Sequence, residues 1–447
     1  MKTFVTICMI APLVLVGCVG MRRAGERQAQ RENAAVEKNY RPHGGQPTLP
    51  VLTADSGLDD FLRFALLNQP AVESSYYDWV ASVQRITVER SLPDPQLTIQ
   101  ADIMKMLVSL MPGISQELPG PGKLKARGAV ATAESQSKYF AFENAVLQAA
   151  FDLKKSYYEL GFIDERLRIN RETLSLLKDL EQIARSQNET GKATLQDVLR
   201  AQIERDRVAT EIANLEDSRQ PMLANFKAAL GLNSTQSNPP APARLEMSTN
   251  LADDEELLRT AFARNPRLKA MEADVRAAQA GISMAYKERV PDFNVGLIVD
   301  VKTSPVLLRP QAGMSLPIWR DKLAAEVAQA KAEELSARSR LSAEQIALTV
   351  EFAEKSFGYR ELNRNLVLLQ TQLIPKARQL LELARANYLS GRIDFFNLMD
   401  AQRTLLDFQM SEVEARTDRE IVMAELSLMI AGRQPDVSPL NPKALKP

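Results

Sequence analysis

The chain contains two copies of one unit, and this duplication constrains its fold more than any other feature. The copies span residues 57–232 and 253–432. Short motifs recur between them in the same order: Lys155-Ser156-Tyr157 with Lys355-Ser356-Phe357, Ala201-Gln202 with Ala401-Gln402, and Leu92-Pro93-Asp94 with Val290-Pro291-Asp292. The first two pairs are offset by 200 residues and the third by 198, so one small indel separates the copies. Solenoid repeats have about 20–50 residues, and we therefore expect a duplicated, domain-sized unit with approximate internal symmetry.

The N-terminus has the features of a secretory signal peptide over residues 1–17. Lys2 supplies the positive charge, and the apolar stretch after it is shorter than the about 20 residues that a membrane-spanning helix needs. The stretch ends in Leu15-Val16-Gly17-Cys18, which resembles a bacterial lipobox, whose cysteine is acylated. The alternative is an ordinary signal peptide followed by a chance cysteine. If the lipobox is real, Cys18 is the lipid anchor, and Val19 after it favours sorting to the outer membrane.

Composition and motifs exclude several classes of protein. The formal net charge is zero, with 56 basic and 56 acidic residues, so nothing indicates a nucleic-acid partner. Cys8 would leave with the signal peptide, so no disulfide framework is expected. The one histidine, His43, lies in a polar segment, and no phosphate-binding loop or nucleophile elbow appears in its expected context. We therefore predict that the protein is not an enzyme and has no cofactor besides the lipid on Cys18.

Three segments outside the copies are expected to contribute little to a core. Residues 18–56, rich in Arg and interrupted by Pro and Gly, are predicted to be a lipidated extended segment. Residues 233–252 form the linker between the copies, and residues 433–447 form a Pro-bearing tail. No apolar run after residue 18 has the length of a transmembrane helix. The mature chain is therefore expected either to be soluble with a lipid tail or to span a membrane as β-strands.

In each copy, a helical stretch is followed by two predicted strands. These cover about residues 95–103 and 113–118 in the first copy, and about residues 292–301 and 311–318 in the second. Apolar and polar residues alternate along them, which is the pattern of a strand with two different faces. The strands approach the length of about 9–11 residues that a tilted transmembrane strand needs.

Two long helices then form a helical hairpin in each copy, over residues 121–230 and 320–430. The first helix of each hairpin would be roughly 100 Å long at a rise of about 1.5 Å per residue. Apolar residues spaced by four and three indicate a coiled-coil seam rather than a broad globular face, although a cytosolic type of bundle would show a related pattern. Gly191 and Gly391 mark the turns between the helices, and Pro375 is expected to kink its helix.

Four strands are too few to close a membrane barrel. Open sheet edges are not tolerated in hydrocarbon, because each unpaired backbone group there costs several kcal/mol. If the strands cross a bilayer, several chains must therefore combine their strands.

Two turn-and-helix motifs carry a resemblance to a known family: GKATLQDVLRAQ at 191–202 and GRIDFFNLMDAQ at 391–402. Together with the two-fold repeat and the strand pairs, these motifs resemble the TolC-like outer-membrane efflux family over nearly all of residues 57–432. The segment GISQELPGPGKL at 113–124 is similar to the heavy-metal-efflux subgroup of that family.

The resemblance implies a mainly α fold with a small β part. The expected assembly is a homotrimer with a 12-stranded transmembrane β-barrel on a long α-helical coiled-coil tube. It implies a passive exit channel in the outer membrane of a Gram-negative bacterium, whose periplasmic helices meet an adaptor protein and an inner-membrane pump. The cargo would be small molecules or metal ions. Two alternatives stay open: an exit duct for type I protein secretion, and a lipid-anchored coiled-coil structural protein whose strands form no pore.

The resemblance also places candidate gate residues at the second hairpin turn. Tyr388 corresponds to a tyrosine that helps hold the periplasmic end shut, and Asp400 to an acidic position that lines the constriction. Asn397 lies where several members carry a second aspartate, and Arg392 lies next to the position of the gating arginine. Copies of Asp394 or Asp400 around a pore would attract cations, whereas the alternative is that both are ordinary solvated charges. Three residues of the hairpin turns are expected to dock the adaptor: Gly191, Thr194 and Gly391.

Three methionines lie near the predicted connection between the first two strands. Thioether sulfur suits Cu(I), so Met104, Met106 and Met111 could contact a soft metal. Methionine more often fills irregular apolar gaps, and no histidine or cysteine accompanies these three. We therefore predict no metal site, and the sequence leaves the transported substrate open.

Overall fold

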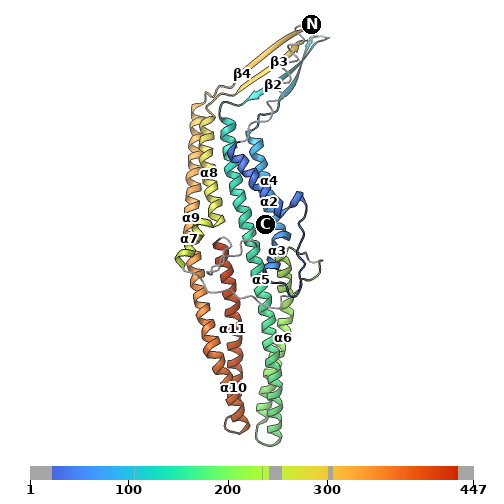
Figure 1. Ribbon diagram of the computed structural model, residues 1–447, viewed down its shortest axis with the longest axis vertical. Coiled ribbons are helices and arrows are strands. Elements are labelled where there is room, and N and C mark those ends of the chain that lie inside the picture. The colour runs from blue at the N-terminus through green and yellow to red at the C-terminus, as the bar shows by residue number, and fades with distance from the viewer. Residues whose placement is uncertain (1–22, 105, 234, 241–253, 301–305, 431–447) are drawn as a thin grey trace. The chain divides into compact units, whose positions relative to one another are not determined.

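The computed structural model describes residues 23–430, apart from residues 105, 234, 241–253 and 301–305 (Figure 1). The predicted signal peptide, Cys18, the tail over 433–447 and most of the linker over 233–252 lie outside the described residues. Within the described ranges, no helix is long and apolar enough to cross a membrane. The chain divides into two compact units, and each unit contains parts of both copies.

The fold is mainly helical with one four-stranded sheet, as predicted. The first unit contains the sheet and the helical segments next to it: α2 (Ala24–Tyr40), η1 (Pro42–Gly44), most of α4 (Pro70–Arg90), β1 (Gln96–Met104), β2 (Met106–Leu118), the start of α5 (Lys123–Glu189), α8 (Pro266–Lys287), β3 (Phe293–Asp300), β4 (Leu307–Met314) and the start of α9 (Arg320–Leu368). The second unit contains the hairpin turns: α3 (Leu58–Asn68), the rest of α5, α6 (Leu195–Ala229), α7 (Asp254–Arg264), the rest of α9, the π-helical turn η2 (Leu369–Leu373), α10 (Ile374–Leu389) and α11 (Phe395–Met429).

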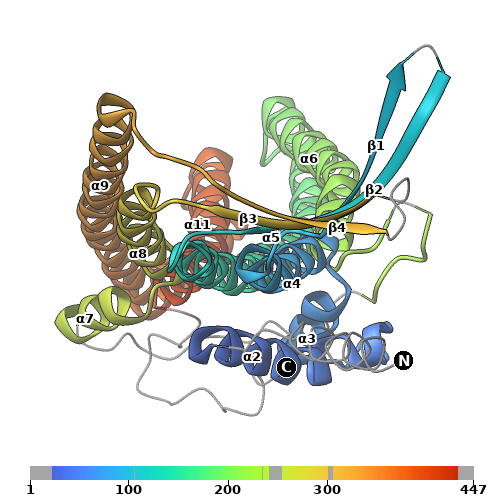
Figure 2. The same cartoon turned by 90° about the horizontal axis from the view of Figure 1, so that it is seen from above.

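The duplication is visible in the order of the elements. Each copy has a short helix, a longer helix, a β-hairpin and a long helical hairpin. The short and longer helices are separated at Pro70 in the first copy and at Pro266 in the second, because proline lacks an amide hydrogen and fits the first position of a new helix. Figure 2 shows α4 beside α5 and α8 beside α9, so equivalent helices have equivalent neighbours.

The four strands form one antiparallel sheet in the order β1-β2-β3-β4. The central pair, β2 with β3, joins the two copies through a ladder that sets Ile114 opposite Leu297. Three strand boundaries differ by several residues from those predicted. β2 begins at Met106 rather than near residue 113. β4 begins at Leu307 rather than near residue 311, and it ends at Met314, before the predicted end at residue 318. The two edges of the sheet, β1 and β4, have no strand beside them among the described residues.

The extended segment predicted over residues 18–56 needs correction, because Ala24–Tyr40 forms helix α2. One face of this helix is buried in the first unit through Glu26, Ala29, Asn33 and Tyr40. The Tyr40 ring packs on the rings of Tyr76 and Phe142, with centroids 5.2 and 5.9 Å apart. Tertiary packing of this face therefore stabilises a helix in a segment whose composition is polar.

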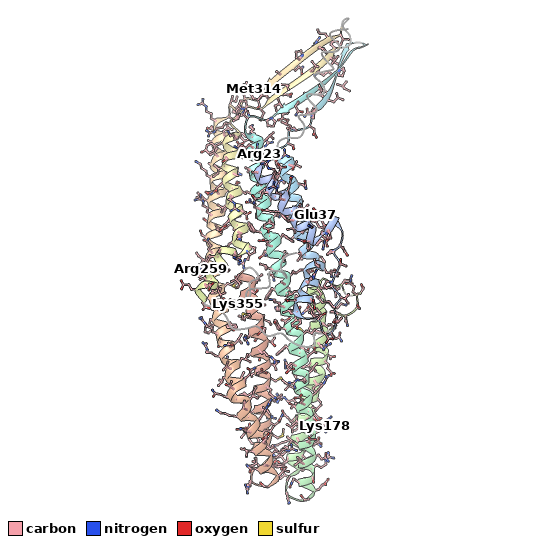
Figure 3. All side chains as sticks on the ribbon, in the orientation of Figure 1. Arg23, Glu37, Lys178, Arg259, Met314 and Lys355 are labelled. Atoms are coloured by element: carbon pink, nitrogen blue, oxygen red, sulfur yellow. The ribbon has the colours of Figure 1, made fainter. Side chains whose placement is uncertain are left out.

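Hydrophobic clusters pack the helices of the second unit together. One cluster surrounds Phe61 and Phe226, whose ring centroids are 5.5 Å apart, and packs α3 against α5 and α6. Another lies near the hairpin turns and is described below. The irregularity predicted at Pro375 takes the form of η2, in which the Ile374 amide donates to the Leu369 carbonyl five residues earlier. Charged side chains such as Lys178 lie exposed along these helices (Figure 3).

Candidate functional site

The two hairpin turns end their first helices in the same way. Gly191 has a φ of +71° and Gly391 a φ of +72°, a conformation that glycine adopts without the steric cost of a Cβ. In the second turn, the Gly391 amide donates to the Tyr388 carbonyl at 3.0 Å, and the Arg392 amide donates to the Asn387 carbonyl at 2.8 Å. The first turn repeats both bonds at equivalent positions, so each is a Schellman motif.

The next helices begin with a carboxylate placed differently in the two turns. In the first turn, the Asp197 carboxylate accepts from the Thr194 amide at 3.0 Å and from the Thr194 hydroxyl at 2.9 Å, as part of a capping box. In the second turn, Asp394 is itself the N-cap, and its carboxylate accepts from the Asn397 amide at 3.0 Å and from the Asn397 side chain at 2.8 Å. The first turn thus has a threonine at the N-cap and the acid three residues later, whereas the second turn has the acid at the N-cap and an asparagine three residues later. In both turns the carboxylate lies at the N-terminus of the next helix.

Tyr388 is the most deeply buried of the candidate gate residues. Its side chain is 8% exposed, and its ring meets the Phe395 ring edge to face at a centroid distance of 5.3 Å. Burial raises the pKa of Tyr388, and the negative charge of Asp197 adds to this effect. The Tyr388 hydroxyl is buried without a hydrogen-bond partner in the part of the chain that the structure describes.

The two hairpins share one hydrophobic cluster near their turns. Buried residues of the first hairpin, including Val198 and Ala201, belong to the same cluster as Tyr388, Phe395 and Leu398 of the second. This cluster therefore places Asp197 close enough to Tyr388 to influence its pKa.

Ion pairs cross between and within the hairpins at the level of this cluster. The Arg403 guanidinium lies 2.6 Å from the carboxylate of Glu204, whose side chain is 6% exposed. Glu181, whose side chain is 9% exposed, pairs with Arg205 at 2.8 Å. Sequence reasoning missed these groups, although a glutamate at a seam position of a coiled coil is the signal that could have found them.

The remaining candidates lie on the surface. Arg392, Asp394, Asn397 and Asp400 are exposed. The structure brings Asp394 and Asn397 together by hydrogen bonds, whereas Asp400 lies further along α11, where its backbone carbonyl accepts from the Thr404 hydroxyl at 2.9 Å. The three expected docking residues, Gly191, Thr194 and Gly391, all belong to the turns themselves.

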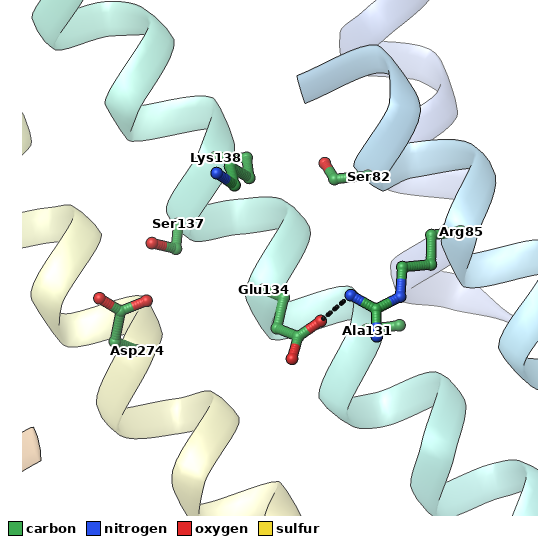
Figure 4. A pocket seen from close by; sticks show the side chains of 7 residues that line it. All are labelled: Ser82, Arg85, Ala131, Glu134, Ser137, Lys138 and Asp274. Atoms are coloured by element: carbon green, nitrogen blue, oxygen red, sulfur yellow. Dashed lines mark ion pairs between the residues drawn. The ribbon is translucent and has the colours of Figure 1, made fainter. Parts of the chain in front are cut away.

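A separate cavity of about 220 Å³ lies in the first unit (Figure 4). It is lined by side chains of both charges, and the Arg85 guanidinium lies 3.2 Å from the Glu134 carboxylate. Lys138 and Asp274 line it from α5 and α8. The described residues contain no group of three or more His, Cys, Asp or Glu side chains that could hold a metal ion, either here or elsewhere. The cavity contains none of the candidate gate residues.

Comparison with known proteins assigns the family. The model of the family described as "Outer membrane efflux protein" matches residues 62–232 and again residues 257–432. The chain belongs to this family. The match occurs once per copy, which agrees with the duplication and confirms the resemblance to TolC-like channels. The protein is accordingly an outer-membrane efflux channel with a periplasmic helical portion, and it is not an enzyme.

Individual relatives agree with this assignment. The cobalt-zinc-cadmium resistance protein CzcC of Cupriavidus metallidurans is 22% identical over 332 residues, which cover 71% of this chain and 76% of that protein. The fold is similar to a membrane protein from Pseudomonas aeruginosa, with a TM-score of 0.74, 18% identity, and coverage of 86% and 98% of the two chains. It is also similar to the CmeC outer membrane channel of Campylobacter jejuni, with a TM-score of 0.73, 12% identity, and coverage of 88% and 90%.

Proposed function

We propose that the protein is the outer-membrane exit duct of a tripartite export system. Three chains would form a 12-stranded barrel, and the helical portion would receive cargo from a periplasmic adaptor and an inner-membrane pump. The observation that carries this proposal is the open sheet. Among the described residues, β1 and β4 have no strand on their outer edges, and in an outer-membrane channel such edges are unstable in hydrocarbon until another chain pairs with them. Acylation of Cys18 would add a lipid anchor to the strands.

The cargo that the comparisons favour is a metal ion. The relative CzcC is named as a cobalt-zinc-cadmium resistance protein, and GISQELPGPGKL at 113–124 is similar to the heavy-metal subgroup. The channel itself would be passive, so ion selection would occur in the pump.

The hairpin turns are the proposed site of adaptor docking. Beside Thr194, the first turns of α6 expose Leu195, Leu199 and Ile203, with exposed fractions of 63%, 49% and 66%. These residues follow each other at intervals of four, so they form one apolar stripe on the helix surface. Contact with an apolar face of an adaptor helix would remove this stripe from water.

The same turns are the proposed gate. The buried Tyr388 hydroxyl has no acceptor among the described residues, and an unsatisfied buried polar group costs about 1–3 kcal/mol. We propose that a neighbouring copy supplies the acceptor in the closed trimer. Arg392, Asp394, Asn397 and Asp400 would then line the narrow end of the duct.

The test is a deletion of the gene in its native host, followed by complementation. Cells that lack the channel should accumulate more zinc, cobalt and cadmium than wild-type cells, and the intact gene should restore the lower level. Accumulation of apolar drugs serves as the control and should change little. A strain whose metal content is unchanged while its drug content rises would overturn the proposed cargo but not the channel. A purified protein that gives no conductance in planar bilayers would overturn the channel.

A further inference from the structure

Equivalent strands of the two copies pair in the same register. β1 and β2 set Gln96 opposite Ser115, whereas β3 and β4 set Asn294 opposite Gly313. Adding 198 to both residue numbers of the first pair gives the second pair. Residues 198 positions apart in the sequence therefore occupy equivalent positions in the two β-hairpins. The surroundings of one β-hairpin can therefore serve as a template for the surroundings of the other.

The two β-hairpins meet at a polar joint below β2 and β3. Lys123, at the start of α5, places its Nζ 2.8 Å from Asp292 and 3.1 Å from Glu288, and its side chain is 4% exposed. The Gly120 amide donates to the other oxygen of Asp292 at 2.7 Å. A side chain at Gly120 would clash with the Pro291 carbonyl, so glycine permits this close approach. Gly120, Lys123, Glu288 and Asp292 are called the copy joint below.

Burial fixes which residue of the second copy corresponds to Lys123. Three pairs of buried residues on α5 and α9 are separated by 199 positions: Gly128 and Val327, Ala131 and Ala330, and Ser135 and Glu334. The same offset relates Lys123-Leu124 to Lys322-Leu323. Lys322 is therefore the equivalent of Lys123, and Asp94, at an offset of 198, is the equivalent of Asp292.

These equivalent residues lack the contacts of the copy joint. The Lys322 side chain is 71% exposed and lies 3.7 Å from Glu326 on its own helix. Asp94 is exposed and forms no ion pair with the described residues. Ala126 is buried on α5, whereas its counterpart Ala325 is exposed on α9. The outer face of α9 therefore lacks a neighbour that α5 has.

One chain cannot bring Lys322 and Asp94 together. They lie below the opposite edges of the sheet, β4 and β1, which are separated by three strand spacings, or about 14 Å. We propose that Lys322 of one copy pairs with Asp94 of the neighbouring copy, and that β4 pairs with β1 of that copy in the register of β2 with β3. This inference rests on the proposed assembly and adds the residues that close it.

The register follows from the equivalence. Gln116 lies opposite Val295, and the offset of 198 converts this pair into Met314 opposite Leu97 of the neighbouring copy. Met314 and Leu97 are 55% and 75% exposed in the single chain (Figure 3 labels Met314). Pairing would cover both apolar side chains.

Cysteine cross-linking tests the register. Directly opposed residues of antiparallel strands lie within the distance that a disulfide spans, and both natural cysteines, Cys8 and Cys18, precede the described residues. The full-length double variant Leu97→Cys/Met314→Cys should form cross-linked dimers and trimers in membranes. The intrachain pair Gln116→Cys/Val295→Cys is the positive control. Thr98→Cys/Met314→Cys is the negative control, because a shift of one residue points the thiols to opposite faces.

The outcomes separate the inference from the proposed function. Stronger cross-linking of the shifted pair overturns the register. A trimer by mass measurement in which neither pair cross-links overturns the inference and leaves the proposed function intact. A stable membrane-inserted monomer overturns both.

Charge exchange tests the ion pair. Lys322→Glu or Asp94→Lys alone should lower the fraction of assembled oligomer about tenfold, since a joint that loses one charge partner leaves the other uncompensated. The double variant should recover most of the loss. Arg320→Glu makes the same charge change two residues away and should have little effect. Loss with Arg320→Glu, or no recovery in the double variant, would refute the pairing of Lys322 with Asp94.

Discussion

The carboxylate of Glu26 lies 2.5 Å from the guanidinium of Arg90, and their side chains are 1% and 10% exposed. Glu26 also accepts from the Thr87 hydroxyl at 2.8 Å. This pair attaches the first turns of α2 to the end of α4 within the first unit. The segment that follows the expected lipid anchor is thus fixed by a buried charge pair only eight residues after Cys18.

Removing one member of this pair should destabilise the first unit strongly. We expect Arg90→Ala to lower the free energy of unfolding by about 3–5 kcal/mol, because it leaves the Glu26 charge buried without compensation. Replacing both residues with methionine should recover much of the loss. Denaturant unfolding of the detergent-solubilised protein measures both variants, and a loss below about 1 kcal/mol, as for a surface pair, would contradict the prediction.

The same pair predicts a dependence on pH. Burial opposes ionisation of Glu26, but hydrogen bonds from Arg90 and Thr87 outweigh it and hold the pKa of Glu26 below its usual value of 4.5. A lowered carboxyl pKa stabilises the fold above the unfolded pKa, and this stability is lost as the pH falls through the folded pKa. Stability should therefore decrease from pH 6 to acidic pH less steeply in Glu26→Gln than in wild type. Parallel curves for the two proteins would show that Glu26 does not contribute.

The turn glycines should be costly to replace. Gly391→Ala forces a side chain into a left-handed backbone conformation, and we expect a loss of about 1–2 kcal/mol. Nothing lies within 4 Å of the added Cβ, so the cost would come from the backbone alone. Gly358→Ala, in the interior of α9 with equally open space, is the matched control and should be neutral or stabilising. Equal effects of the two substitutions would exclude a role for the positive φ.

The proposed gate predicts a change in conductance. Tyr388→Phe combined with Asp400→Ala should raise the resting conductance in planar bilayers and reduce the preference for cations. A hydrogen bond contributes about 0.5–1.5 kcal/mol, and three-fold repetition multiplies the effect. The amount of trimer should not fall, because the open sheet edges, and not this hydrogen bond, are proposed to hold the three chains together. Wild-type conductance and ion preference in the double variant would argue against these residues as the gate.

The lipid anchor has a direct test. Cys18→Ser should abolish labelling with radioactive palmitate, because the acyl acceptor is lost. Insertion of the strands should persist at least in part. Unchanged labelling of the variant would rule out the lipobox.

The sequence revealed the repeated parts of the fold better than the unique ones. The offsets of 198 and 200 predicted equivalent strands and turns, because the same motifs at the same spacing in both copies form the same helices and strands. Helix α2 was missed because its stability comes from the packing of Glu26 and Tyr40 on distant residues. The start of β2 was missed because Met106–Pro112 is apolar almost throughout and shows no alternation.

The candidate site was predictable only in part. The glycines and the positions of Tyr388 and Asp394 could be taken from the motifs, but the role of Asp394 as an N-cap requires knowledge of where α11 begins. The influence of Asp197 on Tyr388 depends on two hairpins that are far apart in sequence. Local patterns carry no information about such contacts.

The π-helical turn η2 sets the angle at which the second hairpin presents its end. The π-turn contains one residue more than a turn of α-helix. The residues after it are therefore rotated about the helix axis by one residue, or about 100° at 3.6 residues per turn. Every side chain from Ile374 to Leu389 therefore points about a quarter-turn away from the direction that an uninterrupted α-helix would give it. The first hairpin has no such offset in α5. Deleting Gln370 would remove the extra residue, so an uninterrupted α-helix would form and Tyr388 would keep the direction that it has now.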